Sequence, residues 1–251
     1  MPWYNPAQPP RAQRPGGPVA RKKTPPPRGP QLELAGALCV AFVNTASARP
    51  NNTQKGVANY AELLIWGQQV GVLSTLDAER LRRLAAERPQ DAAAVYAAGA
   101  RLRLVLTRLF HASRAGKDLP QDDLDAFNTA LAEALPAQRL VRGGDSGLTW
   151  GWAGEEDALD RVLWPVVHSA AETLIATAGR PHVRQCAYKG CTLYFVDSSP
   201  RQRRRWCDRK VCGNRAAALE YYYREGRAKR DKKMRSVDAW KTRRPRKKAR
   251  S

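Results

Sequence analysis

Four cysteines near the C-terminal end of the chain constrain its fold more than any other feature. Cys186, Cys191, Cys207 and Cys212 form the pattern Cys-x4-Cys-x15-Cys-x4-Cys. The two cysteines of each pair are close enough for their thiolates to converge on one ion, and four thiolates suit a closed structural Zn²⁺ site. Residues 181–223 contain few large apolar side chains, so a metal is expected to hold this segment folded. The sequence therefore predicts a four-cysteine zinc finger, with Zn²⁺ as the cofactor.

Other roles for these cysteines are two disulfides or reduced thiols without a metal. The first 30 residues contain no apolar segment of the secretory type, which favours a reducing compartment and a metal site over disulfides. His182, four residues before Cys186, is an alternative ligand that could replace a cysteine. No run of about 18 apolar residues is present, so we expect no membrane span and a cytoplasmic location.

The net charge of +21 is concentrated at the two ends of the chain. Residues 1–30 carry six Lys/Arg and no acids, and residues 181–251 carry 23 basic and six acidic residues. Residues 31–180 are nearly neutral, with 15 basic and 17 acidic residues. A neutral body with a basic, cysteine-containing end indicates a polyanionic partner, with nucleic acid first and an anionic membrane second. Solvated spacers are the alternative explanation of the basic tails.

The rest of the chain predicts a mainly α fold with a small β-hairpin (α+β), followed by the small zinc finger and flanked by disordered basic termini. Dense proline makes residues 1–30 a disordered Pro/Arg-rich tail. Residues 31–180 show helical periodicity in four or more stretches, while an apolar run at 33–45 fits a buried helix or strand. Two short apolar runs around RGGDSG predict a hairpin over 138–152. Residues 224–251 continue a helix and then form a basic tail.

Within the finger, we expect a strand over CTLYFVD, a turn over SSPRQRRR and a helix that opens at Cys212. The turn and the helix start are rich in cations, five of them within the eight residues from Arg203 to Lys210. Such cations could contact phosphates, which would position a nucleic acid without reading its sequence. The predicted nucleic-acid contacts are Arg201, Arg203, Arg204, Arg205, Arg209, Lys210 and Arg215.

Three further residues are expected to support the finger: Asp197, Trp206 and Asn214. Asp197 is a lone acid among arginines and could pair with Arg215, which would otherwise reach a phosphate. Trp206, beside a ligand, fits the small core of the finger better than a base-stacking role. Asn214 could accept from a backbone N–H or bond a thiolate. In the helical domain, Asn44 caps a helix end or lines a ligand pocket.

The ending Trp206-Cys207 and Cys212-Gly213-Asn214-Arg215 resembles the CGNR zinc-finger family. That family places a cysteine pair, an F-x-D stretch (here Phe195 and Asp197), an arginine-rich turn and W-C-x4-C-G-N-R in the same order. The N-terminal part resembles the ABATE domain that is usually fused to this finger. Its matching stretches are AFVNT with Asn44 and Thr45, the Y-x2-L-x2-W of Tyr60, Leu63 and Trp66, and LWPVVHSAAETL.

The resemblance covers residues 31–223 and implies a bacterial, stress-linked regulator of transcription that associates with the nucleoid when bound. One departure is AALEYYY after CGNR, where relatives carry more basic residues. We expect a DNA-binding regulator whose helical domain supplies a dimer interface, a ligand sensor, or both. RNA binding or ribosome association is one alternative, and a zinc-stabilised protein-interaction module is the other. The chain lacks a Gly-rich phosphate loop, HExxH and a serine elbow, so no enzyme is expected.

Overall fold

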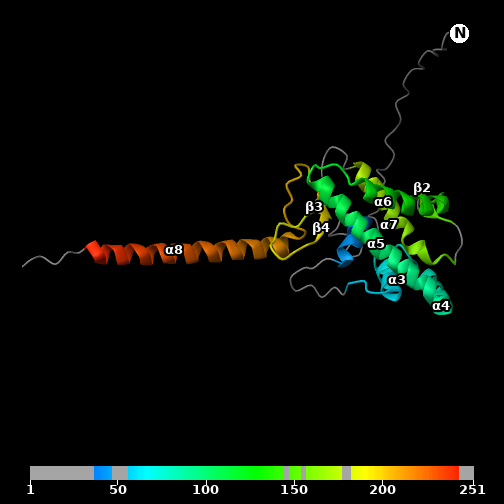
Figure 1. The fold of residues 1–251 in the computed structure, drawn as a ribbon, viewed down its shortest axis with the longest axis horizontal. Coiled ribbons are helices and arrows are strands. Elements are labelled where there is room, and N and C mark those ends of the chain that lie inside the picture. The colour runs from blue at the N-terminus through cyan, green and yellow to red at the C-terminus, as the bar shows by residue number, and fades with distance from the viewer. Residues whose placement is uncertain (1–36, 47–55, 144–146, 154–156, 177–181, 243–251) are drawn as a thin grey trace, which may run out of the picture.

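The computed structural model describes residues 37–46, 56–143, 147–153, 157–176 and 182–242, with side chains through residue 234. The described part is a mainly helical domain with small hairpins, followed by a four-cysteine cluster, which confirms the predicted fold class (Figure 1). The predicted tail 1–30 and the end of the predicted tail 224–251 lie outside the described residues.

The apolar run near the start of the helical domain forms a short helix, α2 (Leu38–Val43). Five of its six residues, from Cys39 to Val43, are at most 2% exposed. A helix that is apolar all round is stable only when it is covered on every side. Helices α5 and α7 and strand β4 of the finger all contact α2, so this helix is the centre of the core.

Two helices follow with clear start signals, α3 (Tyr60–Gln69) and α4 (Thr75–Glu87). Ser74 and Asp77 form a reciprocal capping box at the start of α4. The aromatic and apolar residues of α3 enter the core, where Trp66 lies 5.4 Å from the Phe42 ring. Since Tyr60 is also buried, its hydroxyl donates to the Leu159 carbonyl at 2.7 Å.

The longest helix of the domain, α5 (Pro89–Arg114), spans the whole body and packs on α6 (Gln121–Ala134). It begins at Pro89, because the fixed φ of proline and its missing N–H suit the first helical position. The last helix of the domain is α7 (Trp164–Ala176), and Pro165 lies in its first turn rather than at a kink.

The predicted hairpin is confirmed, with β1 (Gln138–Arg142) antiparallel to β2 (Leu148–Trp152). Gln138 pairs with Trp152 at the base of the hairpin. Trp152 anchors this base to α7, because its ring lies 6.3 Å from that of Trp164.

The finger contains β3 (Val183–Gln185), β4 (Tyr194–Val196), a π-helical turn η5 (Arg209–Gly213) and helix α8 (Asn214–Thr242). Strands β3 and β4 pair antiparallel. Helix α8 extends away from the body as a single rod (Figure 1), and its 29 residues give it a length of about 44 Å. Within the described residues, no helix combines the length and the apolar character that crossing a membrane requires.

Candidate metal centre

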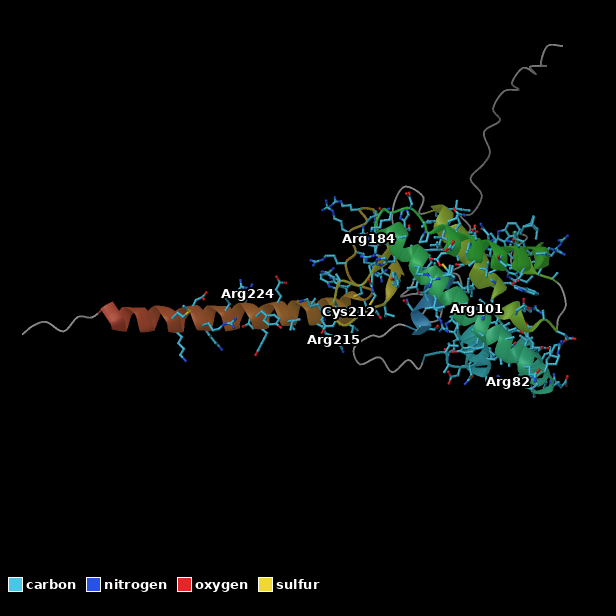
Figure 2. All side chains as sticks on the ribbon, viewed as in Figure 1. Arg82, Arg101, Arg184, Cys212, Arg215 and Arg224 are labelled. Carbon is cyan, nitrogen blue, oxygen red and sulfur yellow. The ribbon has the colours of Figure 1, made fainter. Side chains whose placement is uncertain are left out.

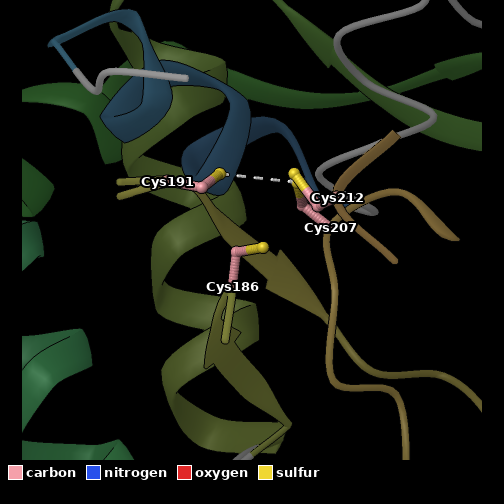
Figure 3. A group of neighbouring side chains, drawn as sticks. All are labelled: Cys186, Cys191, Cys207 and Cys212. Carbon is pink, nitrogen blue, oxygen red and sulfur yellow. Dashed lines mark hydrogen bonds between the residues drawn. The ribbon is translucent and has the colours of Figure 1, made fainter. Parts of the chain in front are cut away.

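The four cysteines that are predicted to bind zinc meet in one buried cluster. Their Sγ atoms all lie within 4.8 Å of one another, and Figure 3 shows the four side chains converging. The Sγ atom of Cys207 is 3.7 Å from that of Cys191 and 3.7 Å from that of Cys212. Four sulfurs placed tetrahedrally at about 2.3 Å from a zinc ion would lie about 3.8 Å apart. The number, the chemistry and the spacing of these donors therefore suit Zn²⁺.

The first cysteine pair occupies the tight loop between β3 and β4. Cys186 directly follows β3, and its N–H donates to the Leu193 carbonyl at 2.9 Å, which extends the strand pairing to the first ligand. Gly190 has a φ of +85°, a conformation that suits glycine, and Cys191 then donates to the Tyr188 carbonyl at 3.0 Å. This turn directs both thiols to the same side.

The second pair sits where helical structure begins. Asp208 caps this start, because its carboxylate accepts from the N–H groups of Lys210 at 2.8 Å and Val211 at 3.1 Å. Helical structure thus opens at Arg209, three residues earlier than predicted. Cys212 lies inside the first turn, and its own N–H donates to the Asp208 carbonyl at 2.9 Å.

The cluster favours a thiolate before any ion is considered. Hydrogen bonding from Cys191, and then from Cys207, holds the pKa of the Cys186 thiol well below its usual range. The same hydrogen bonding raises the pKa of the Cys191 and Cys207 thiols, so the cluster stabilises one thiolate, and a metal that needs deprotonated ligands would displace the protons of these two.

Asp197 organises the arginine-rich turn from within the finger. The residue is fully buried, and its Oδ2 atom is 3.2 Å from Nε of Arg184, so Arg184 rather than Arg215 supplies the charge partner seen in the structure. The carboxylate also accepts from the hydroxyl of Ser199 at 2.6 Å and from the backbone N–H of Arg204 at 3.0 Å. Burial acts to raise the pKa of Asp197, but these hydrogen bonds and the Arg184 charge outweigh it and leave that pKa below its ordinary value.

Arg204, predicted to contact phosphate, is instead engaged within the finger. Its guanidinium lies 4.4 Å from the centre of the Phe195 ring, which is fully buried. The same group donates to the carbonyl of Trp206 at 3.0 Å and to that of Cys207. A cation that stacks on a buried ring and ties down the backbone of a ligand supports the fold, so Arg204 has a structural role in the finger, and its phosphate contact stays a prediction.

Gly213 lies against the half-buried Trp206 ring at the start of α8. A Cβ atom there would lie 3.4 Å from the indole, an ordinary van der Waals contact, so the space at this position does not by itself require glycine. Asn214 is exposed, and the predicted contact of its side chain with a thiolate or a backbone N–H is not seen among the residues that the structure describes. Arg215 is half-buried.

The remaining predicted phosphate contacts are exposed cations around the second cysteine pair: Arg201, Arg203, Arg205, Arg209 and Lys210. Arg205 lies over the Trp206 ring at 5.1 Å. His182 is not brought into the metal cluster, because its Nδ1 atom lies 2.8 Å from the amide nitrogen of Gln202.

The finger is docked on the helical domain through the β3–β4 hairpin. One face of the hairpin, with Val183 and Tyr194, belongs to the core of the helical domain, whereas Phe195 faces the cysteine cluster. Asn44 joins the two parts through its carboxamide. Its Nδ2 atom donates to the Tyr194 carbonyl at 2.9 Å, and its Oδ1 atom accepts from the Tyr194 N–H at 2.8 Å. Asn44 thus acts as an extra strand residue beside β4, a role that sequence reasoning missed.

Replacement of Asn44 by alanine is expected to lower the free energy of unfolding by about 2–3 kcal/mol. The reason is that both backbone groups of Tyr194 would lose their partner at the junction. Urea denaturation of the zinc-loaded protein measures this. Asn128→Ala, at an exposed site on α6, is the matched control and should change stability by less than about 0.5 kcal/mol. Equal stabilities of the two variants would contradict the role assigned to Asn44.

The roles of two other residues of this site are not among the predictions made from the sequence. Asp208 carries a signal that could have been used, since an acid just before a helical segment is a typical N-cap. Arg184 carries none, because its pairing with Asp197 depends on the register of β3 and β4 across the cysteine loop.

Comparison with known proteins agrees with this geometry. Residues 182–225 match the CGNR zinc finger, and residues 36–177 match the ABATE family, described as a putative stress-induced transcription regulator. No curated protein matches the chain. The second match spans more than half of the sequence, and its description is that of a regulator and not of an enzyme. The chain is therefore a member of the ABATE family of transcription regulators, with a CGNR zinc finger after its helical domain.

Proposed function

We propose that this protein is a DNA-binding regulator of transcription, in which the zinc-bound finger and helix α8 contact the phosphate backbone. The observation that carries the proposal is the set of exposed cations on the loop and turn that surround the second cysteine pair: Arg201, Arg203, Arg205, Arg209 and Lys210.

The finger supports this function because it holds these cations on fixed backbone. Asp197 ties the turn through Ser199 and the N–H of Arg204, and Asp208 fixes the start of helical structure. Cations on a preorganised backbone lose less freedom when they bind a phosphate than cations on a free tail. Such contacts set the position of a protein on DNA, while base contacts set its specificity.

Helix α8 extends the basic surface beyond the finger. Figure 2 shows Arg215 and Arg224 along this helix, which projects away from the body. Arg224, Arg227 and Arg230 are all exposed. The length of about 44 Å exceeds one turn of a DNA duplex, and the major groove is wide enough for an α-helix. The C-terminal Lys/Arg tail, which we also expect to contact phosphates, lies outside the described residues.

A second candidate function is RNA binding, which one observation on α8 favours. Tyr221, Tyr222 and Tyr223 are 58%, 71% and 61% exposed. Aromatic rings on a basic surface can stack on unpaired bases, which duplex DNA does not offer. A protein partner could instead dock on the same tyrosines. Added salt would weaken such binding little, whereas it would weaken the binding of DNA or RNA strongly.

The test is selection from a random-sequence DNA duplex pool with full-length, zinc-loaded protein at near-physiological salt. Enrichment of one motif is the result expected for a sequence-specific regulator. Such a protein would be located at the bacterial nucleoid when it is bound. Tighter binding to structured or single-stranded RNA than to the selected duplexes would establish the RNA alternative. Failure to bind either nucleic acid would overturn the proposal.

A further inference from the structure

A cavity of about 420 Å³ lies where the helical domain meets the finger. Helix α5, the loop from α5 to α6, and Tyr194 of strand β4 form its walls. The loop is well defined, because Gly116 has a φ of +63° and the N–H of Lys117 returns to the Ala112 carbonyl at 3.1 Å. The volume falls within the range that sites for small ligands span.

The floor of this junction pocket is apolar, with the polar end of one buried side chain at its border. Ala112, Pro120 and the Tyr194 ring line the floor. Tyr194 is only 6% exposed, and its ring packs 6.4 Å from that of Phe110. The side chain borders the pocket, and no hydrogen bond of its hydroxyl is seen among the described residues. The hydroxyl oxygen is not one of the fully buried polar atoms that lack a partner, so it is accessible and could bond a ligand.

Among the charged residues that line the junction pocket, Lys117 is a cation available to a ligand. Arg108 contributes little, because Nε of Arg108 donates to Oδ1 of Asp123 at 2.8 Å and the two charges cancel. Lys117 is exposed and makes no ion pair with the described residues, and Asp118 is the acid in the lining. A cation beside an apolar surface favours a ligand that joins an apolar body to one negative group.

We propose that the junction pocket binds a small amphipathic organic acid. Its apolar body would lie on Ala112, Pro120 and the Tyr194 ring, and its carboxylate would face Lys117 and the Tyr194 hydroxyl. The proposal goes beyond the binding of nucleic acid and stands without it. Since Tyr194 lies three residues after Cys191, such a ligand would touch the finger hairpin and the helical domain at once.

The experiment uses full-length, zinc-loaded protein and isothermal titration calorimetry with 2-naphthoate as the probe. The neutral analogue 2-naphthalenemethanol has the same ring and no charge. We expect 2-naphthoate to bind with a stoichiometry of one and to bind about fivefold to tenfold more tightly than the alcohol, because one partly exposed charge contact separates them. Equal affinities, or no binding of 2-naphthoate at millimolar concentration, would overturn the proposal.

Two variants locate the binding at this pocket. Lys117→Glu, at an exposed residue, should weaken 2-naphthoate about tenfold, and Tyr194→Phe should weaken it about threefold while leaving the alcohol unchanged. Arg101→Glu makes the same change of charge on an exposed part of α5 and should have no effect. Zinc content and far-ultraviolet circular dichroism check that each variant is folded. Undiminished binding to Lys117→Glu would place the ligand elsewhere and refute the pocket.

Discussion

Cys207→Ser protein is expected to lose its zinc. Cys207 is central to the cluster, with its Sγ atom 3.7 Å from that of Cys191 and 3.7 Å from that of Cys212. Structural zinc sites with four ligands contribute about 10–16 kcal/mol, so losing one thiolate removes about 3 kcal/mol or more, a factor of roughly 150 in affinity. We expect about one zinc per chain in the parent protein and far less in the variant after dialysis against a competing chelator. Atomic absorption measures both.

The control for this prediction is the fifth cysteine. Cys39 is fully buried in α2, and its thiol lies 3.3 Å from Oγ1 of Thr173. Burial raises the pKa of this thiol, so it is a neutral packing group. Cys39→Ser should keep its zinc, because the hydroxyl can use the same polar neighbours. Stoichiometric zinc in Cys207→Ser, or its loss from Cys39→Ser, would contradict the four-cysteine site.

Removal of three exposed arginines from the finger is expected to weaken DNA binding strongly and to reduce its salt dependence. Arg201, Arg203 and Arg209 are exposed, and their side chains make no ion pair with the described residues. Each phosphate contact contributes about −0.9 to the slope of log K against log[salt], so the triple alanine variant should have a slope shallower by about 2.7. We also expect affinity for a fixed duplex to fall at least about tenfold at near-physiological salt. Fluorescence anisotropy at several salt concentrations measures both quantities.

The matched control removes three arginines from the helical domain. Arg82, Arg83 and Arg101 are exposed, and Figure 2 shows Arg82 and Arg101 on the body rather than on α8. Their triple alanine variant has the same net charge as the finger variant. If both variants lose the same affinity and slope, binding depends on overall charge and not on the finger surface. Zinc content of both variants verifies that the finger is intact.

Sequence reasoning succeeded where a local pattern dictates the structure. Periodicity indicated the helices of the domain. The two apolar runs around a turn gave the β1–β2 hairpin. The spacing of the four cysteines predicted the metal cluster correctly, because the type and the spacing of the ligands largely determine a structural zinc site.

It did not reach roles that depend on contacts distant in sequence. Arg204 looks identical to its neighbours Arg203 and Arg205, and only the buried Phe195 ring and the Cys207 carbonyl distinguish it. The apolar run that forms α2 fits a helix and a strand equally well from the sequence. A segment that is covered on all sides has no polar face, so its hydrophobic pattern does not show whether the period is that of a helix or of a strand.

The three tyrosines of α8 show that burial, too, is hard to predict from the sequence. Three successive residues cannot share one face of a helix, yet Tyr221, Tyr222 and Tyr223 are all exposed. The structure explains this, because α8 projects from the body and has no core to cover in the described part of the chain.

The shared β3–β4 hairpin means that this finger cannot be treated as a portable module. The gap between the two family matches, residues 178–181, suggests a natural place to cut the chain. A finger excised there would carry Val183 and Tyr194 into water, and the helical domain left behind would lose part of the wall around α2. A chimera that exchanges fingers between relatives would therefore have to carry over the inner face of the hairpin together with its partner Asn44. The finger and the helical domain would then be expected to diversify together rather than by domain shuffling.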